Sequence, residues 1–248
     1  MRRRTQQQLV TAALLIAAAG VAAIAAPYVH QDVATGDSLP TPSTAQPSAS
    51  STVSAAQVAD ALQDLRALPV SDAYVPARYD RDAFGQAWAD TDRNGCDTRN
   101  DVLRRDLTAV VTKPGTNGCV VLSGTLHDPY TGRTIVFERG NTSSLAVQID
   151  HRVPLAYAWR HGAASWTPEE RERFANDQAA NLVAVDGPAN EEKSDFGPAE
   201  WMPANTGDAC SYAASFVTVA TKWRLSIATA DEGALNRILT GCTSKGSN

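Results

Sequence analysis

The stretch QIDHRVPL, residues 148–155, places an acid and a histidine next to each other at the end of an apolar run. The residues leading to it, SLAVQID, have the β-branched and apolar composition of a short strand. A polar turn with an idle, hydrogen-bonded histidine is the simplest interpretation of Asp150 and His151. The rest of the chain decides between that interpretation and a catalytic one.

A second short strand and the start of a helix follow about 30 residues later. The apolar run NLVAVDG begins at Asn181, and Asn190 and Lys193 come after it. Two strands followed by a helix can bring the ends of all three elements to one point. There Asp150 and Asn190 would offer oxygen ligands to a hard divalent cation, with His151 free beside it.

Most of the other segments have helical periodicity. A β-hairpin is expected within residues 118–140, where β-branched runs flank the turn-forming DPYTG. Apolar spacing predicts helices over residues 54–68, 81–92, 98–111, 155–163, 167–178, 209–228 and 231–242. Residues 188–201 have the pattern of a turn into a helix that Gly197 and Pro198 interrupt. The expected fold class is therefore α+β, a helix-rich domain with a small antiparallel sheet.

The N-terminal segment has the pattern of an export signal. MRRRTQQQ is basic, and the apolar run of residues 9–26 ends in small residues. This run is long for a cleaved signal and only just long enough to span a bilayer, so residues 1–26 are either a signal peptide or a membrane anchor. Both alternatives place the chain outside the cytoplasm. Residues 27–57 are rich in Ser, Thr, Ala and Pro, and this composition predicts a flexible linker. The composition of residues 58–248 is that of one globular domain.

The four cysteines fit an exported domain. Their spacing includes no C-x-x-C pair, which argues against a structural zinc site. An even number in an exported chain favours two disulfides. Three connectivities are open, and local pairing is preferred, Cys96 with Cys119 and Cys210 with Cys242.

The net charge of −5 argues against a protein that coats nucleic acid through a broad basic surface. It leaves room for an enzyme that holds a few phosphates locally.

The order of these motifs resembles the HNH endonuclease signature, the ββα-metal motif. DHRVP followed by NLVAVDGPANEEK carries this resemblance. A wider similarity to a family of exported actinobacterial HNH endonuclease-like proteins covers about residues 79–242, through GCDTRNDVLRRDL, DPYTG, IDHRVPLAYAW, FANDQAANLVAV and NEEKSDFGPAEWMP. The connection between Asp-His and Asn181 is longer than in minimal HNH motifs. The resemblance implies a ββα-metal core inside the helix-rich domain.

The resemblance also implies a role for each residue. Asp150 and Asn190 would bind Mg²⁺ or Mn²⁺, and His151 would act as general base. Asn181 would tie the loop of the motif together, and Lys193 would contact substrate phosphate. A histidine with a pKa of about 6.5 is mostly neutral at pH 7 and can take a proton from water. The implied activity is weakly sequence-specific, metal-dependent cleavage of DNA, with RNA as an open second substrate.

Alternatives remain at three places. Residues 90–101, DTDRNGCDTRND, imitate an EF-hand calcium loop, or they form an Asn-Gly turn that positions Cys96. Arg99 either contacts a phosphate or forms an ion pair on a helix surface. For the whole protein, the rival function is a non-catalytic cell-surface binding protein on the same scaffold. Loss of Asp150, His151 or Asn190 would favour that rival, and none of them is lost.

Overall fold

The computed structural model describes residues 53–73 and 77–245. The expected signal or anchor, residues 1–26, and most of the expected linker lie outside these residues. The first helix, α1 (Ala55–Ala67), begins within the last residues assigned to the linker, so the folded domain starts before residue 58. None of the helices in the described part of the chain combines the length and the apolar character needed to cross a bilayer.

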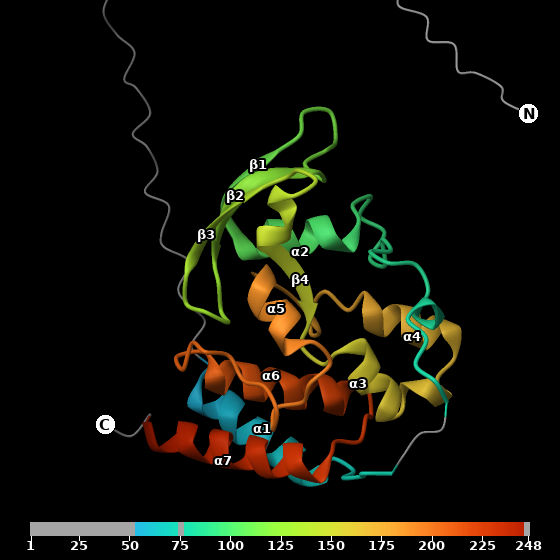
Figure 1. The fold of residues 1–248 in the computed structure, drawn as a ribbon, viewed down its shortest axis with the longest axis vertical. Coiled ribbons are helices and arrows are strands. Elements are labelled where there is room, and N and C mark those ends of the chain that lie inside the picture. Colours follow the sequence, from blue (N-terminus) through green and yellow to red (C-terminus); the bar gives the residue numbers. More distant parts are fainter. Residues whose placement is uncertain (1–52, 74–76, 246–248) are drawn as a thin grey trace, which may run out of the picture. The chain divides into compact units, whose positions relative to one another are not determined.

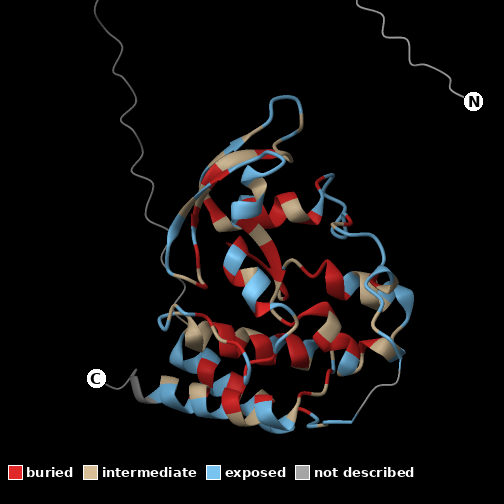
Figure 2. Ribbon diagram, in the orientation of Figure 1, coloured by how far each residue is buried: buried red, intermediate tan, exposed pale blue. Residues whose placement is uncertain are grey.

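Three helices form one layer of the domain. Helices α1, α6 (Ala209–Lys222) and α7 (Thr229–Lys245) pack against one another (Figure 1). On α1 the buried residues recur at helical spacing and form the inner face: Val58, Ala61 and Leu65. Figure 2 shows α6 as the most deeply buried of the three. This layer contributes a large share of the larger of two hydrophobic cores.

A curved antiparallel sheet forms the opposite layer. Its strand order is β1 (Leu107–Thr112), β2 (Val121–His127) and β3 (Thr134–Glu138), and it covers α2 (Thr98–Asp106) (Figure 1). The second hydrophobic core lies beneath this sheet. The expected hairpin is confirmed as the pair β2 and β3.

A separate two-stranded sheet lies between the two cores. Strand β4 (Val147–His151) pairs antiparallel with β5 (Leu182–Asp186). All five residues of β5 are buried, and alternate side chains enter different cores, with Leu182 in the core beneath the sheet and Val183 in the helical core. This follows from strand geometry, because successive side chains point to opposite faces. Strand β5 is therefore shared by both halves of the domain.

The remaining helices connect these layers. They are α3 (Leu155–Arg160), α4 (Pro168–Ala175) and α5 (Gly187–Lys193), with short 3₁₀ turns η1 (Asp82–Phe84), η2 (Ser143–Ala146) and η3 (Ala163–Ser165). Helix α4 begins with a capping box between Thr167 and Glu170. The described domain has seven α-helices and two small antiparallel sheets, so the expected α+β class is confirmed.

Two of the helical predictions are wrong. In residues 81–92 only η1 is helical, because the chain turns at Gly85 (φ 75°) and Trp88 (φ 60°). In residues 98–111 the helix ends at Asp106, and the rest is strand β1. Pairing with β2 decides this second case, since β-branched residues fit a pleated, half-buried surface.

Both disulfides follow the preferred local pairing. Cys96 is bonded to Cys119, and Cys210 is bonded to Cys242. The described chain has no free cysteine. The first bond fixes the turn before α2 to the loop between β1 and β2, and the second joins α6 to α7. Each half of the domain therefore has its own covalent crosslink.

Candidate active site

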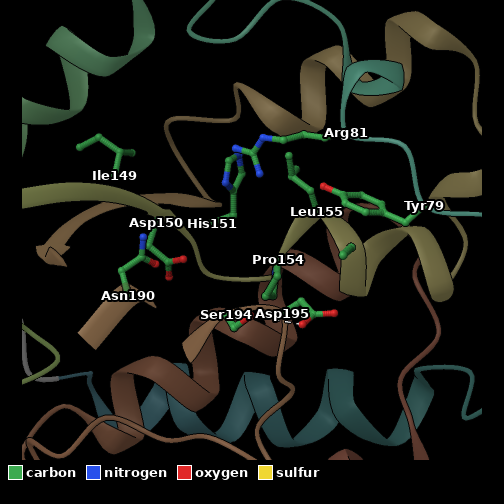
Figure 3. A pocket seen from close by; sticks show the side chains of 11 residues that line it. Tyr79, Arg81, Ile149, Asp150, His151, Pro154, Leu155, Asn190, Ser194 and Asp195 are labelled. Carbon is green, nitrogen blue, oxygen red and sulfur yellow. Dashed lines mark hydrogen bonds between the residues drawn. The ribbon is translucent and has the colours of Figure 1, made fainter. Parts of the chain in front are cut away.

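The end of strand β4, the start of helix α3 and helix α5 contribute residues to a pocket of about 500 Å³. In Figure 3, Asp150, His151 and Asn190 lie together at one end of this pocket. The lining residues are Tyr79, Arg81, Ile149, Asp150, His151, Pro154, Leu155, Ala156, Asn190, Ser194 and Asp195. The structure thus brings together three of the residues that were expected to form the site.

The local sequence explains how α5 presents its residues. The Asp186 side chain accepts a hydrogen bond from the backbone N–H of Ala189 and caps the helix at its start. The helix ends at Lys193, because Ser194 adopts a positive φ of 49°. Asn190 and Lys193 are three residues apart and therefore share one side of the helix. That side faces the end of β4.

The His151 ring is held in one tautomer. Its Nε2 lies 2.9 Å from the carbonyl oxygen of Ala175. A carbonyl can only accept a hydrogen bond, so Nε2 carries the proton of the neutral ring and Nδ1 keeps its lone pair. Burial lowers the pKa of His151 to about 4, so the ring is neutral at pH 7. The free lone pair on Nδ1 of a neutral ring is what a general base requires.

The low pKa of His151 predicts how activity depends on pH. Protonation would remove the general base that the HNH resemblance implies, so we expect kcat/KM to be maintained as the pH falls from 7 to 5 and to decline through about pH 4. Because the unfolded chain binds this proton with a pKa of about 6.5, stability also decreases between pH 6.5 and 4. Initial rates of DNA cleavage, with circular dichroism at each pH to monitor folding, measure both effects. A decline in rate centred near pH 6.5 would contradict the buried, neutral ring.

Asp150 is engaged by two buried partners. Its Oδ2 accepts a hydrogen bond from the Tyr130 hydroxyl at 2.5 Å, and its Oδ1 lies 3.0 Å from the Lys193 ammonium. Lys193 also donates to the backbone carbonyl of His151 at 2.9 Å. Burial raises the pKa of Tyr130 well above its usual value, which keeps the hydroxyl protonated as a donor. The carboxylate is therefore held in a fixed orientation beneath the pocket.

Lys193 does not have the role expected for it. Its side chain has 0% exposure, and its ammonium is used by Asp150 and by the backbone of β4. A group with no exposed surface cannot contact a substrate phosphate in this arrangement. Lys193 is instead a positioning residue, which fixes Asp150 and the end of β4.

Asn181 ties the loop after β4 to the start of β5. Its Oδ1 accepts a hydrogen bond from the backbone N–H of Val153 at 2.9 Å, and its Nδ2 donates to the Val153 carbonyl at 3.4 Å. Asn181 is fully buried and does not line the pocket. These contacts match the loop-tying role that was expected, so Asn181 is also a positioning residue.

The donor atoms of the site suit a hard cation that keeps most of its water. The Nδ2 of Asn190 donates to Gln148 at 2.8 Å, which leaves Oδ1 as the atom available to a ligand. Asp150 adds carboxylate oxygens, although Lys193 already balances its charge. Among the described residues no cluster of three His, Cys, Asp or Glu side chains is arranged to hold a metal. Such a sparse oxygen set fits hydrated Mg²⁺ better than zinc.

Arg99 and the calcium-like loop lie elsewhere. Arg99 is on α2, near Arg139, and is not among the residues that line the pocket. In residues 90–101, Asp90 accepts hydrogen bonds from the backbone of the turn itself, and the Asn94 side chain donates to Asp101. These contacts support the Asn-Gly turn that positions Cys96.

Two residues of the site were missed in the sequence. Tyr130 belongs to the DPYTG turn, whose sequence predicts only a change of direction, yet its hydroxyl reaches Asp150. Arg81 lies in a segment with apparent helical spacing, and its side chain lines the pocket beside His151 (Figure 3). Neither position carries a signal in local periodicity, because both contacts depend on how distant segments pack.

Comparison with known proteins identifies the family of this chain. Residues 97–238 match the family model described as GmrSD restriction endonucleases, C-terminal domain. A protein of Arthroderma benhamiae described as an uncharacterized secreted protein is 39% identical over 165 residues, which is 66% of this chain and 76% of that protein. No solved structure matches the chain. Since the family model spans more than half of the chain and includes β4, β5 and α5, the chain belongs to the family of GmrSD restriction endonuclease C-terminal domains.

Proposed function

We propose that this protein is an exported endonuclease that hydrolyses phosphodiester bonds in DNA, with His151 as the general base and one divalent cation. The observation that carries this proposal is the state of the His151 ring. It is neutral, held through Nε2 by the Ala175 carbonyl, and lies in a pocket with Asp150 and Asn190. Membership of a restriction endonuclease family supports the same chemistry.

The reaction needs a base, a charge stabiliser and a leaving group that departs as an alkoxide. Nδ1 of His151 would take the proton from water as the water oxygen attacks phosphorus. The bond to the 3′ oxygen breaks, and this oxygen takes a proton from solvent water, which leaves a 3′-hydroxyl and a 5′-phosphate. A cation held by Asn190 and Asp150 would stabilise the developing negative charge as a Lewis acid. These groups would be held in position by Asn181, Lys193 and the Ala175 carbonyl.

Export is the second part of this proposal. The two disulfides suit an oxidising compartment, and the Arthroderma benhamiae relative is described as secreted. The basic and apolar start of the chain supports the same location. Residues 9–26, the expected signal peptide or anchor, lie outside the described residues.

Activity should depend on Mg²⁺ or Mn²⁺. Full-length protein isolated with its disulfides intact is treated with EDTA and given supercoiled plasmid or RNA with Mg²⁺, Mn²⁺, Zn²⁺ or no metal. We expect nicked and linear plasmid with Mg²⁺ or Mn²⁺, and little with Zn²⁺, because zinc can bind Nδ1 of the neutral His151 ring and remove the base. His151→Ala protein that is purified in the same way controls for contaminating nuclease.

The outcomes of this experiment separate the alternatives. Full activity with zinc alone would contradict the assigned cation. DNA binding without cleavage under every condition would support the non-catalytic binding protein instead. The RNA samples decide whether RNA is a second substrate.

A further inference from the structure

The pocket needs a positive charge that its expected residues do not supply. A phosphodiester is an anion, and the protein as a whole carries a net charge of −5. The charge of Lys193 is balanced by Asp150 and has no exposed surface. Asp195, at the other end of the pocket, is paired with Arg160 at 2.5 Å. A further cationic side chain at the pocket would add to the attraction that the proposed divalent cation exerts on the substrate.

Arg81 is the one arginine or lysine among the residues that line the pocket. It is exposed, and none of its neighbours in the pocket is a carboxylate left without a partner of its own. Figure 3 shows its guanidinium beside the His151 ring, with Asp150 and Asn190 on the other side of that ring. The positive charge thus lies beside the ring of the proposed base.

We propose that Arg81 binds the phosphate of the substrate next to His151, as a substrate-binding residue of the active site. The inference rests on the proposed function. A guanidinium presents a planar fork that matches two phosphate oxygens, so it both attracts and orients the group to be attacked. With a cation near Asn190 on the opposite side, the phosphate would be held from two directions.

The backbone that carries Arg81 is built into the fold. Arg81 is the residue immediately before η1, and Phe84 at the end of η1 is only 3% exposed. The Phe84 ring packs against Trp159 and Phe174, with centroid distances of 6.1 and 6.2 Å. This anchor keeps the Arg81 side chain over the pocket rather than leaving it on a free loop.

A second contact fixes the same turn. The Arg171 guanidinium of α4 donates to the Ala83 carbonyl at 2.8 Å. Helix α4 also ends at Ala175, whose carbonyl holds the His151 ring. The segments that present the base and the proposed phosphate ligand are therefore fastened to the same helix. Their spacing is preserved whenever α4 is in place.

Cleavage kinetics provide the first test. Arg81→Gln should lower kcat/KM for DNA about 10- to 100-fold, as expected for loss of a charged hydrogen bond to phosphate. Arg81→Lys keeps the positive charge but lacks the planar guanidinium, so its kcat/KM should fall less than that of Arg81→Gln. Arg78→Gln is the matched control, because Arg78 is an exposed arginine of the same segment that does not line the pocket. We expect the control to stay within about twofold of wild type.

Binding provides a readout that does not depend on turnover. The inactive His151→Ala protein is titrated with a fluorescent DNA oligonucleotide at several salt concentrations, with and without Arg81→Gln or Arg78→Gln. Loss of one phosphate contact should weaken binding and reduce the slope of log K against log salt by about 1 in the Arg81→Gln protein alone.

The two proposals fail in different ways. If wild-type protein cleaves DNA and Arg81→Gln behaves like Arg78→Gln in both assays, the role of Arg81 is wrong and the nuclease stands. If wild-type protein cleaves under no condition, the proposed nuclease fails, and the salt slopes still decide whether Arg81 holds a phosphate.

Discussion

Replacing His151 with alanine should lower the rate of DNA cleavage by about 10²- to 10⁴-fold, the usual contribution of a general base. The ring is neutral, and its Nε2 is fixed by the Ala175 carbonyl, so Nδ1 is the atom proposed to accept the proton. The variant should fold, because loss of the ring removes a single hydrogen bond. Rates on supercoiled plasmid with Mg²⁺, compared at equal protein concentration, measure the effect.

His127→Ala is the control for this substitution. His127 is exposed at the end of β2 and contacts Thr134 rather than the pocket. The His127→Ala protein should cleave DNA at the wild-type rate. If His151→Ala were as active as His127→Ala, the assigned base would be wrong, whatever the metal dependence.

Replacing Lys193 with methionine should destabilise the protein by about 3–5 kcal/mol, the cost of leaving a buried charge without its partner. Asp150 is 5% exposed, and without Lys193 its carboxylate would keep only the Tyr130 hydroxyl as a direct partner. Asp150→Ala should be destabilising for the converse reason, because it leaves the buried Lys193 ammonium without its carboxylate partner. Urea unfolding without reductant, followed by circular dichroism, gives the free energies.

A double variant and a surface pair make this prediction specific. Asp150→Ala combined with Lys193→Met removes both charges and should cost less than the sum of the single variants. Arg160→Ala breaks the half-exposed pair with Asp195 and should cost only about 0.2–1 kcal/mol. If Lys193→Met cost no more than Arg160→Ala while cleavage was lost, Lys193 would act on substrate and its positioning role would be wrong.

Much of the site could be predicted because its information is local. The order strand, Asp-His, Asn181, strand, Asn190 fixes which residues meet once two strands pair and a helix follows. The capping box at Thr167 and the even number of cysteines are equally local signals. These features need no knowledge of how distant segments pack.

The parts that could not be predicted depend on tertiary contacts. Lys193 follows two glutamates, and this local sequence is typical of a solvated helix face. Its side chain is buried instead, because it pairs with Asp150, which is 43 residues away in the sequence. Arg81 reaches the pocket only because η1 docks on α4. Strand β1 has apolar residues at helical spacing, and pairing with β2 overrides that preference.

The position of β5 has a consequence for how this protein would lose its candidate site. Its side chains belong alternately to the helical core and to the core beneath the curved sheet, Asn181 lies just before it, and its last residue, Asp186, caps α5. Removal of either half of the domain would take away one of the two cores that bury this strand. We therefore expect that neither half alone holds Asp150, His151 and Asn190 together, so the site depends on an unbroken domain.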